Sequence, residues 1–216
     1  MPRKPADQSV NKEDILIAAA QVLRENGYDG TTMKDIAAKV NLTAASLYHH
    51  FKSKDFLLLA VLEIGLEYAI KDMEKIIEED VSNLEKLKEM IRTHITSITS
   101  NTAVGAAMVF EIRSLINVKL TSRKGKPNKS QTEFINRRDH FFNRRDYFES
   151  LLRSVVKDGI QSGEFRATDP AIITKAMLGA HNWVGVWYRD AGRLSGDQVA
   201  DIMIDFFIQS LTCART

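Results

Sequence analysis

Apolar residues recur along this chain at intervals of three and four positions, and no stretch sustains a strict alternation of apolar and polar residues. Such spacing is typical of amphipathic α-helices, so the sequence predicts an all-α fold. The first predicted helix begins at the cap Asn11 and stops at Gly27, and the next three follow the caps Thr32, Thr43 and Ser53. Further helices are predicted over residues 82–100, 103–120, 130–162, 170–190 and 195–212.

A helix-turn-helix unit is predicted in residues 32–58, which read "TMKDIAAKVNLTAASLYHHFKSKDFLL". A helix of about eight residues, a tight turn and a second helix are what such a unit requires. The side chains expected to lock the two helices together are Ile36, Ala37, Val40, Leu47 and Phe51. The outer face of the second helix would carry small or hydrogen-bonding side chains, which suit entry into a DNA major groove. These side chains are Thr43, Ala44, Ala45, Ser46, Tyr48 and His49.

The local charge of this unit favours contact with DNA. From Ile36 through Lys54 there are three lysines and no aspartate or glutamate, although the whole chain has a formal net charge of only +2. A phosphate backbone would therefore meet no opposing carboxylate here, whereas the chain as a whole is too balanced to bind a polyanion. The competing interpretation is a helical-bundle element with an ordinary polar face.

Residues 136–149 read "NRRDHFFNRRDYFE" and repeat a seven-residue unit almost twice. Seven residues advance a helix by nearly two full turns, so one apolar stripe results, with arginines at its two flanks and aspartates on the opposite side. The stripe consists of Phe134, Phe141, Phe148, Leu152 and Val155, and the flanking arginines are Arg137, Arg138, Arg144 and Arg145. A nucleic-acid surface would turn the arginines outward, so two interpretations remain: ion pairs with carboxylates such as Glu111, or an anionic ligand.

The last two predicted helices cover residues 170–212, and Gly192 is expected to close the first of them. One stripe on that helix combines small residues, which permit close helix packing, with two indoles that supply a large apolar area. It contains Ala176, Gly179, Ala180, Trp183, Val184 and Trp187. We interpret the stripe as a seam between two subunits, while burial within one subunit is the alternative, above all for Trp183.

Composition excludes several classes of protein. The N-terminus lacks a signal-peptide core, no apolar run approaches ~20 residues, and Cys213 is the only cysteine. We therefore expect a protein of the reducing cytoplasm without a membrane span, disulfide or zinc site. His94, His140 and His181 are isolated in the sequence, so no metal is expected. No nucleophile elbow, phosphate loop or paired-carboxylate motif occurs, so neither an enzyme nor a cofactor is predicted.

The segment "MKDIAAKVNLTAASLYHHFKSKDFLL" resembles the DNA-binding signature of TetR-type repressors, and the resemblance covers residues 12–58. It implies a homodimer with a flexible basic arm over residues 1–11, a helix-turn-helix domain over 12–54 and an effector-binding and dimerisation domain over 55–216. The outer-face residues from Thr43 to His49 would then face operator DNA, and the phosphate contacts would be Thr32, Lys52 and Lys54. Asn41 stands where many members have glycine, and asparagine tolerates the left-handed conformation of such a turn.

The segment "LGAHNWVGVWYRDAGRLS" at 178–195 is similar to a branch of these repressors that responds to acyl-coenzyme A thioesters of lipid or steroid breakdown. The resemblance implies an effector with an apolar tail and an anionic head, and a dimer interface within residues 170–212. Residues expected to line the cavity are Met108, Phe110, Phe141, Phe148, Trp183 and Trp187. Cations expected to hold the phosphates are Arg123, Lys124, Lys126, Arg144 and Arg145.

Three other functions remain open from the sequence. An efflux-type repressor that senses planar cationic drugs would show carboxylates rather than arginines in its cavity. An enzyme would need a pocket of convergent titratable groups, and a helical adaptor would not bind DNA at all.

Overall fold

The computed structural model describes residues 10–110, 112–117 and 128–212 of the chain. Within these residues every regular element is a helix and no strand occurs, so the all-α prediction is confirmed. Most of the predicted basic arm lies outside the described residues. The same is true of Glu111 and of the predicted phosphate contacts Arg123, Lys124 and Lys126.

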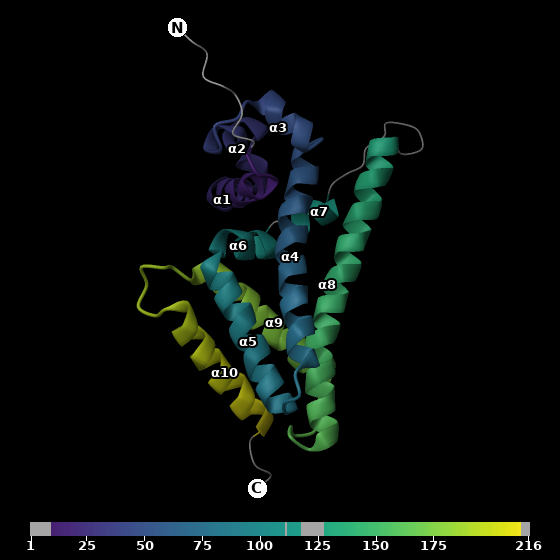
Figure 1. Cartoon of the computed structure of the whole chain (residues 1–216), viewed down its shortest axis with the longest axis vertical. Helices are drawn as coiled ribbons and strands as arrows, with labels where there is room; N and C mark the ends of the chain where they lie inside the picture. Colours follow the sequence, from purple (N-terminus) through teal and green to yellow (C-terminus); the bar gives the residue numbers. More distant parts are fainter. Residues whose placement is uncertain (1–9, 111, 118–127, 213–216) are drawn as a thin grey trace.

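Three helices form one end of the molecule (Figure 1): α1 (Lys12–Gly30), α2 (Met33–Lys39) and α3 (Ala44–His50). Their starts agree with the predicted caps, because the side chains of Asn11, Thr32 and Thr43 each accept a hydrogen bond from a backbone N–H of the first turn. The predicted stop at Gly27 is a break with φ 67°, after which the chain makes one more turn to Gly30.

The turn between α2 and α3 depends on one left-handed residue. Asn41 has φ 56°, and it is the only non-glycine residue with positive φ in the described part of the chain. The backbone N–H of the next residue, Leu42, donates to the carbonyl of Ala37 at 2.9 Å and closes the turn. Leu47 and Phe51 then reach the core beside Ile36, as the sequence predicted.

The remaining helices build a larger bundle, which lies below α1, α2 and α3 in Figure 1. They are α4 (Lys54–Glu78), α5 (Asn83–Ser100), α6 (Thr102–Phe110), α7 (Ile112–Asn117), α8 (Lys129–Ser162), α9 (Pro170–Trp187) and α10 (Gly196–Thr212). The long helix α4 belongs to both parts, since it begins beside α3 and runs down the bundle along α8 (Figure 1). Helix α6 lies directly against α1 and α9.

Two helix boundaries differ from the sequence prediction. The single helix predicted over 103–120 is two helices, α6 and α7, and the break falls at residue 111, outside the described residues. Helix α9 ends at Trp187 rather than at Gly192, because Tyr188 turns to an extended conformation and buries its side chain. Gly192 lies in the turn that follows, where its N–H donates to the carbonyl of Arg189 at 2.8 Å.

Two arginines of the repeated segment hold α8 against α4. Arg137 Nε donates to both carboxylate oxygens of Glu63 at 2.8 and 2.9 Å. One helical repeat further on, Arg144 forms two parallel hydrogen bonds of 2.7 Å with Glu67, which raise the pKa of the arginine and lower that of the glutamate. These two arginines therefore form ion pairs, and both partners come from α4.

Two histidines that are far apart in the sequence meet in the core. His94 of α5 and His181 of α9 bring their Nδ1 atoms to 3.2 Å, and both side chains are buried. This pair could not be predicted from the sequence, because 87 residues separate its members. Burial lowers the pKa of His94 to about 4, and burial together with the neighbouring His94 lowers that of His181 well below its ordinary value.

The buried pair predicts that acid destabilises the fold. Between the ordinary histidine pKa of 6.5 and a folded pKa of about 4, the unfolded chain binds a proton at His94 that the folded chain does not bind. The free energy of unfolding should therefore fall as the pH falls through this window, by roughly 3 kcal/mol from His94 alone. Denaturant titrations from pH 7.5 to pH 4 would measure this slope.

The matched control replaces both partners, His94→Phe with His181→Leu, so that no buried ring nitrogen is left without a partner. This variant should show a much flatter profile between pH 7.5 and pH 4. An equal slope in the variant and the parent protein would mean that other groups cause the acid sensitivity.

Candidate DNA interface and effector cavity

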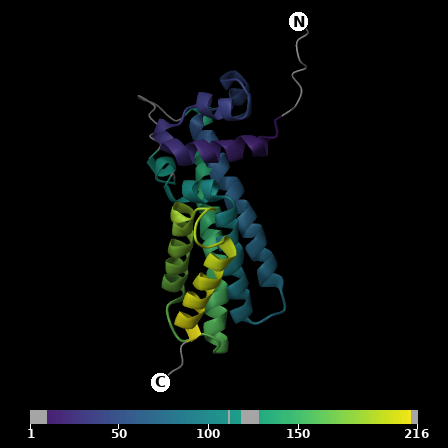
Figure 2. The same ribbon diagram turned by 90° about the vertical axis from the view of Figure 1, so that its left-hand side faces the viewer.

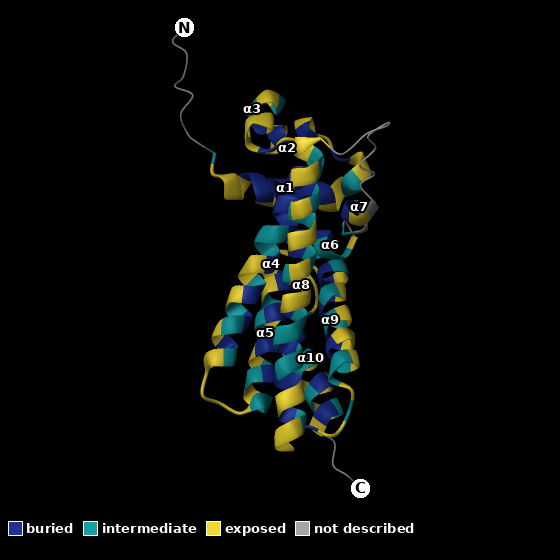
Figure 3. Cartoon of the chain, turned by 90° about the vertical axis from the view of Figure 1, so that its right-hand side faces the viewer, coloured by how far each residue is buried: buried dark blue, intermediate teal, exposed yellow. Residues whose placement is uncertain are grey.

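The outer face of α3 lies at the end of the molecule (Figure 3) and carries the residues predicted to meet DNA. Leu47 is completely buried and fixes the rotation of the helix. Tyr48, with 53% of its surface exposed, and His49 therefore point to solvent. Thr43 and Ala45 are exposed as well, and Ala44 and Ser46 are half-buried. All six predicted residues thus lie on one short helix and its cap.

The first turn of α3 is held by its own hydroxyl groups. Thr43 Oγ1 accepts from the backbone N–H of Ser46 at 3.0 Å, and the hydroxyl oxygens of the two residues lie 2.9 Å apart. A capped first turn keeps the recognition helix formed before it meets DNA.

The three predicted phosphate contacts have different surroundings. Thr32 is exposed and forms a capping box with Asp35. Lys52 is exposed and pairs with Glu133 of α8. Lys54 instead donates to the backbone carbonyls of Tyr28 and Thr31 at 2.6 and 2.9 Å. Lys54 therefore stabilises the end of α1, and only Thr32 and Lys52 present an exposed side chain.

An apolar cavity of about 420 Å³ lies where α1 meets the bundle. This volume is in the range of about 300–1,000 Å³ that is typical of small-molecule sites. Its walls come from α1, α4, α5, α6, α8 and α9. The apolar part of the wall includes Leu16, Ile17, Ile64, Leu66, Ala69, Ile98, Val104, Met108, Phe148 and Leu178.

Three of the predicted effector residues line this cavity: Met108, Arg145 and Phe148. The other five do not. Phe141 fills the core between helices, and Arg144 is turned toward Glu67 of α4. Phe110, Trp183 and Trp187 lie on the outer surface, with 46–54% of their area exposed.

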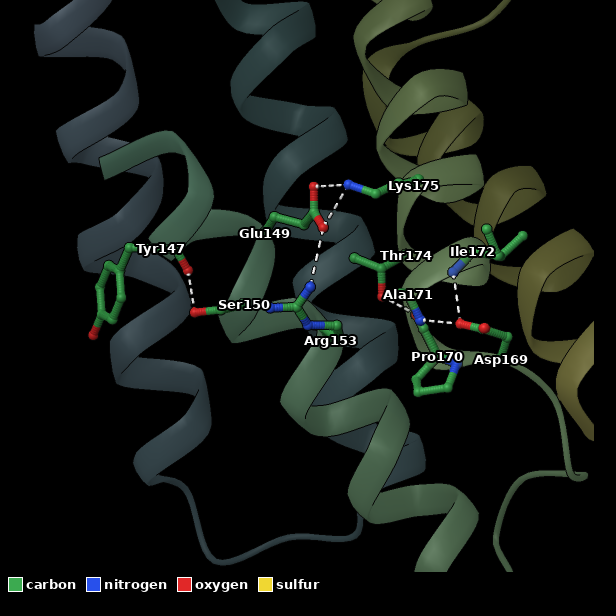
Figure 4. Close-up of polar contacts among 10 residues, drawn as sticks. All are labelled: Tyr147, Glu149, Ser150, Arg153, Asp169, Pro170, Ala171, Ile172, Thr174 and Lys175. Carbon is green, nitrogen blue, oxygen red and sulfur yellow. Dashed lines mark hydrogen bonds and ion pairs between the residues drawn. The ribbon is translucent and has the colours of Figure 1, made fainter. Parts of the chain in front are cut away.

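Charged side chains surround part of the cavity. Lys175 Nζ donates to both carboxylate oxygens of Glu149 at 2.8 Å, and Arg153 reaches the same carboxylate at 3.3 Å (Figure 4). The charge of Glu149 is therefore offset from two sides. Arg145 and Asp146 are exposed beside it, and Arg145 forms no ion pair within the described residues.

Helix α1 closes one side of the cavity. Leu16 and Ile17 line the wall, and the Tyr68 hydroxyl of α4 donates to Glu13 Oε1 at 3.0 Å. This hydrogen bond raises the pKa of Tyr68. The sequence did not predict these contacts, because α1 was assigned to DNA binding alone. A ligand in the cavity would touch the same helix that supports the recognition helix.

Two further features of the described residues concern metal binding and membrane-spanning helices. No three His, Cys, Asp or Glu side chains there are placed to hold a metal ion together. None of the helices described is both long and apolar enough to cross a membrane.

Comparison with known proteins supports both halves of this arrangement. Residues 15–61 match the model of bacterial regulatory proteins of the tetR family, and residues 132–211 match the tetracyclin repressor-like C-terminal domain. The HTH-type transcriptional repressor KstR2 of Mycolicibacterium smegmatis is 25% identical over 212 residues, which cover 98% of this chain and 95% of that protein.

Two further relatives have different named roles. The fatty acid metabolism regulator protein of Bacillus subtilis is 26% identical over 164 residues, which cover 76% of this chain and 75% of that protein. The structure of AibR in complex with isovaleryl coenzyme A and operator DNA has a TM-score of 0.71 and 26% identity, covering 90% of this chain and 96% of that one. The family and these relatives are regulators rather than enzymes. The chain is a DNA-binding transcriptional repressor of the TetR family.

Proposed function

We propose that this repressor leaves its operator when an acyl-coenzyme A thioester binds in the cavity between α1 and the bundle. The observation that carries the proposal is the combination of an apolar cavity with the exposed cations Arg145 and Lys175 at its edge. An acyl or ring-bearing tail would bury its apolar surface inside, and the charged nucleotide would remain at the edge beside these cations. The relatives named for fatty acid metabolism and for an isovaleryl coenzyme A complex agree with this effector class.

The proposed DNA contacts are the exposed residues of α3 together with Thr32 and Lys52. Tyr48 and His49 are the two largest polar side chains on this face, so they would reach the base edges, while Ala45 permits close approach. Thr32 and Lys52 would fix the register by contacting phosphates. Because operator DNA of a bacterial regulator is in the cytoplasm, the proposal places the protein there.

Release of DNA would follow from the position of α1. A ligand lowers DNA affinity only if it binds better to the conformation that binds DNA less well. Leu16 and Ile17 contact the cavity, whereas Ile15 and Leu23 of the same helix are buried in the core. A ligand that displaces α1 would therefore move α2 and α3 with it.

The protein is proposed to act as a homodimer through α9 and α10, which lie on the same side of the bundle (Figure 2). Their outer faces expose Trp183, Trp187, Ile202 and Phe206. So large an apolar surface is typical of a protein interface. Of the predicted seam, Ala176 and Gly179 are also exposed, whereas Val184 is completely buried and packs within its own subunit.

We expect Tyr48→Ala with His49→Ala to weaken specific DNA binding by tenfold or more, because each base contact contributes about 1–3 kcal/mol. A gel-shift titration with the DNA upstream of the gene would measure the loss. The control, His140→Ala with Tyr147→Ala, removes the same residue types from α8. If the α3 variant binds like the parent protein, the assigned face is wrong.

Palmitoyl-coenzyme A should raise the melting temperature and dissociate the operator complex, and free palmitate should act much more weakly because it lacks the phosphates. Arg145→Gln should weaken the thioester about fivefold to tenfold, whereas Arg144→Gln should not, because Arg144 pairs with Glu67 outside the cavity. If thioesters of every chain length fail and a planar cation releases DNA, the protein senses drugs instead. Glu13, Asp146 and Glu149 would then be the relevant wall residues.

Trp183→Glu with Phe206→Glu should convert the dimer to a monomer, because association would bury two unpaired charges. Sedimentation at micromolar concentration would show the change. Val81→Glu alters an exposed apolar residue in the turn between α4 and α5, outside both helices, and serves as the control. A double variant that still sediments as a tight dimer would place the interface elsewhere.

A further inference from the structure

His94 is the only histidine among the residues that line the cavity. Its side chain is 7% exposed, and its ring packs edge-on against Phe148, another wall residue, with centroids 5.2 Å apart. The larger part of the surrounding wall is apolar, and its other uncharged hydrogen-bonding side chains are Tyr68, Ser97, Asn101 and Asn182. Which hydrogen bond His94 can make depends on the state of its two ring nitrogens.

The pair His94–His181 fixes that state. Since burial keeps both rings neutral near pH 7, each carries a single N–H. The Nδ1 atoms are 3.2 Å apart, so one of them must donate and the other must accept. The two arrangements differ in what they leave at His181 Nε2, which is buried and has no hydrogen-bond partner within the described residues.

If His94 donates, His181 must carry its proton on Nε2, which leaves a buried N–H unsatisfied. If His181 donates, the unpaired Nε2 is an acceptor. Unpaired buried N–H groups are rarer than under-satisfied acceptors, so the second arrangement is favoured. His94 then accepts at Nδ1 and carries its proton on Nε2.

The Nε2 atom of His94 has no partner among the described residues, yet it is not enclosed. His181 Nε2 is the one unpaired side-chain nitrogen or oxygen in the described part of the chain that is fully buried. We infer that this nitrogen faces the cavity, because His94 is one of the residues of the cavity wall. The N–H is thus a preformed donor in largely apolar surroundings, where an unmet hydrogen bond is costly.

We propose that His94 Nε2–H is a specificity-determining donor that selects ligands with a carbonyl oxygen on an otherwise apolar body. This inference rests on the proposed function only in that the ligand enters the same cavity. Two kinds of carbonyl would meet the requirement: the thioester carbonyl of an acyl-coenzyme A, or a ketone on a ring of a polycyclic acyl group. A saturated tail whose oxygens all lie elsewhere would leave the donor unsatisfied.

The tautomers can be tested without any ligand. Long-range ¹H–¹⁵N correlation spectra of the full chain at pH 7 should show His94 protonated at Nε2 and His181 at Nδ1, with His94→Phe and His181→Leu used for assignment. The reverse pattern, or a doubly protonated His94, would overturn the proposal, because no neutral donor would then face the cavity as described.

Matched ligands test the selectivity. Palmitoyl-coenzyme A is compared with S-hexadecyl-coenzyme A, which has CH₂ in place of the thioester carbonyl. For the ring ketone, 3-oxocholanoyl-coenzyme A is compared with cholanoyl-coenzyme A. The variant His94→Phe with His181→Leu keeps an aromatic ring beside Phe148 and leaves no buried histidine nitrogen unpaired. His140→Phe, an exposed histidine of α8, is the control.

The double variant should lose about fivefold to tenfold in affinity for the ligand whose carbonyl meets His94, and nothing for the counterpart that lacks this carbonyl. The pair of ligands that shows this difference identifies which carbonyl, the thioester or the ring ketone, accepts from His94. Equal losses for both members of both pairs would overturn the role of His94 even though thioesters bind. If no thioester binds the parent protein, the proposed effector class fails instead, and the tautomer spectra still decide the assignment of His94.

Discussion

The packing of α1 is the contact on which the rest of the structure depends, because one helix serves two surfaces. Ile15, Ala19 and Leu23 are buried in the core that carries α2 and α3. Leu16 and Ile17, which directly follow Ile15 on the same helix, belong to the cavity wall. A change in how well α1 fits the bundle would therefore move α2 and α3 as well, as the proposed release of DNA requires.

The contact between α8 and α4 is built to resist movement. Arg137 and Arg144 clamp α8 to α4 through two-pronged hydrogen bonds one helical repeat apart, and charge-assisted pairs of this geometry fix the register of the helices. Both pairs are half-exposed, so their contribution to stability is modest, and their value lies in orientation. With α4 and α8 fixed, expansion of the cavity is directed toward α1 and α6.

The DNA-binding half could be predicted from the sequence because its signals are local. Caps, a left-handed Asn41 and the buried Leu47 lie within a few residues of one another. The cavity could not be predicted in this way, because six helices contribute to its wall. Residues that are neighbours in the sequence also have different surroundings. Arg144 and Arg145 differ by about 100° of helical rotation. One pairs with Glu67 and the other lines the cavity. Trp183 and Trp187 of α9 were wrongly expected in the cavity wall for a similar reason: periodicity identifies an apolar face but not what packs against it.

An apolar cavity alone gives a repressor poor discrimination, because each added methylene group contributes only about 0.8 kcal/mol and most lipids would bind. Discrimination needs a polar group that is costly to leave unpaired. The His94–His181 pair supplies one at the junction of α5 and α9, where His181 also contacts Phe207 of α10. A ligand oxygen on His94 would therefore be recognised by α5, whose histidine is held by His181 of α9, while the ligand tail meets α1. Recognition and release would then depend on different helices of one cavity wall, so a ligand could satisfy the first without causing the second.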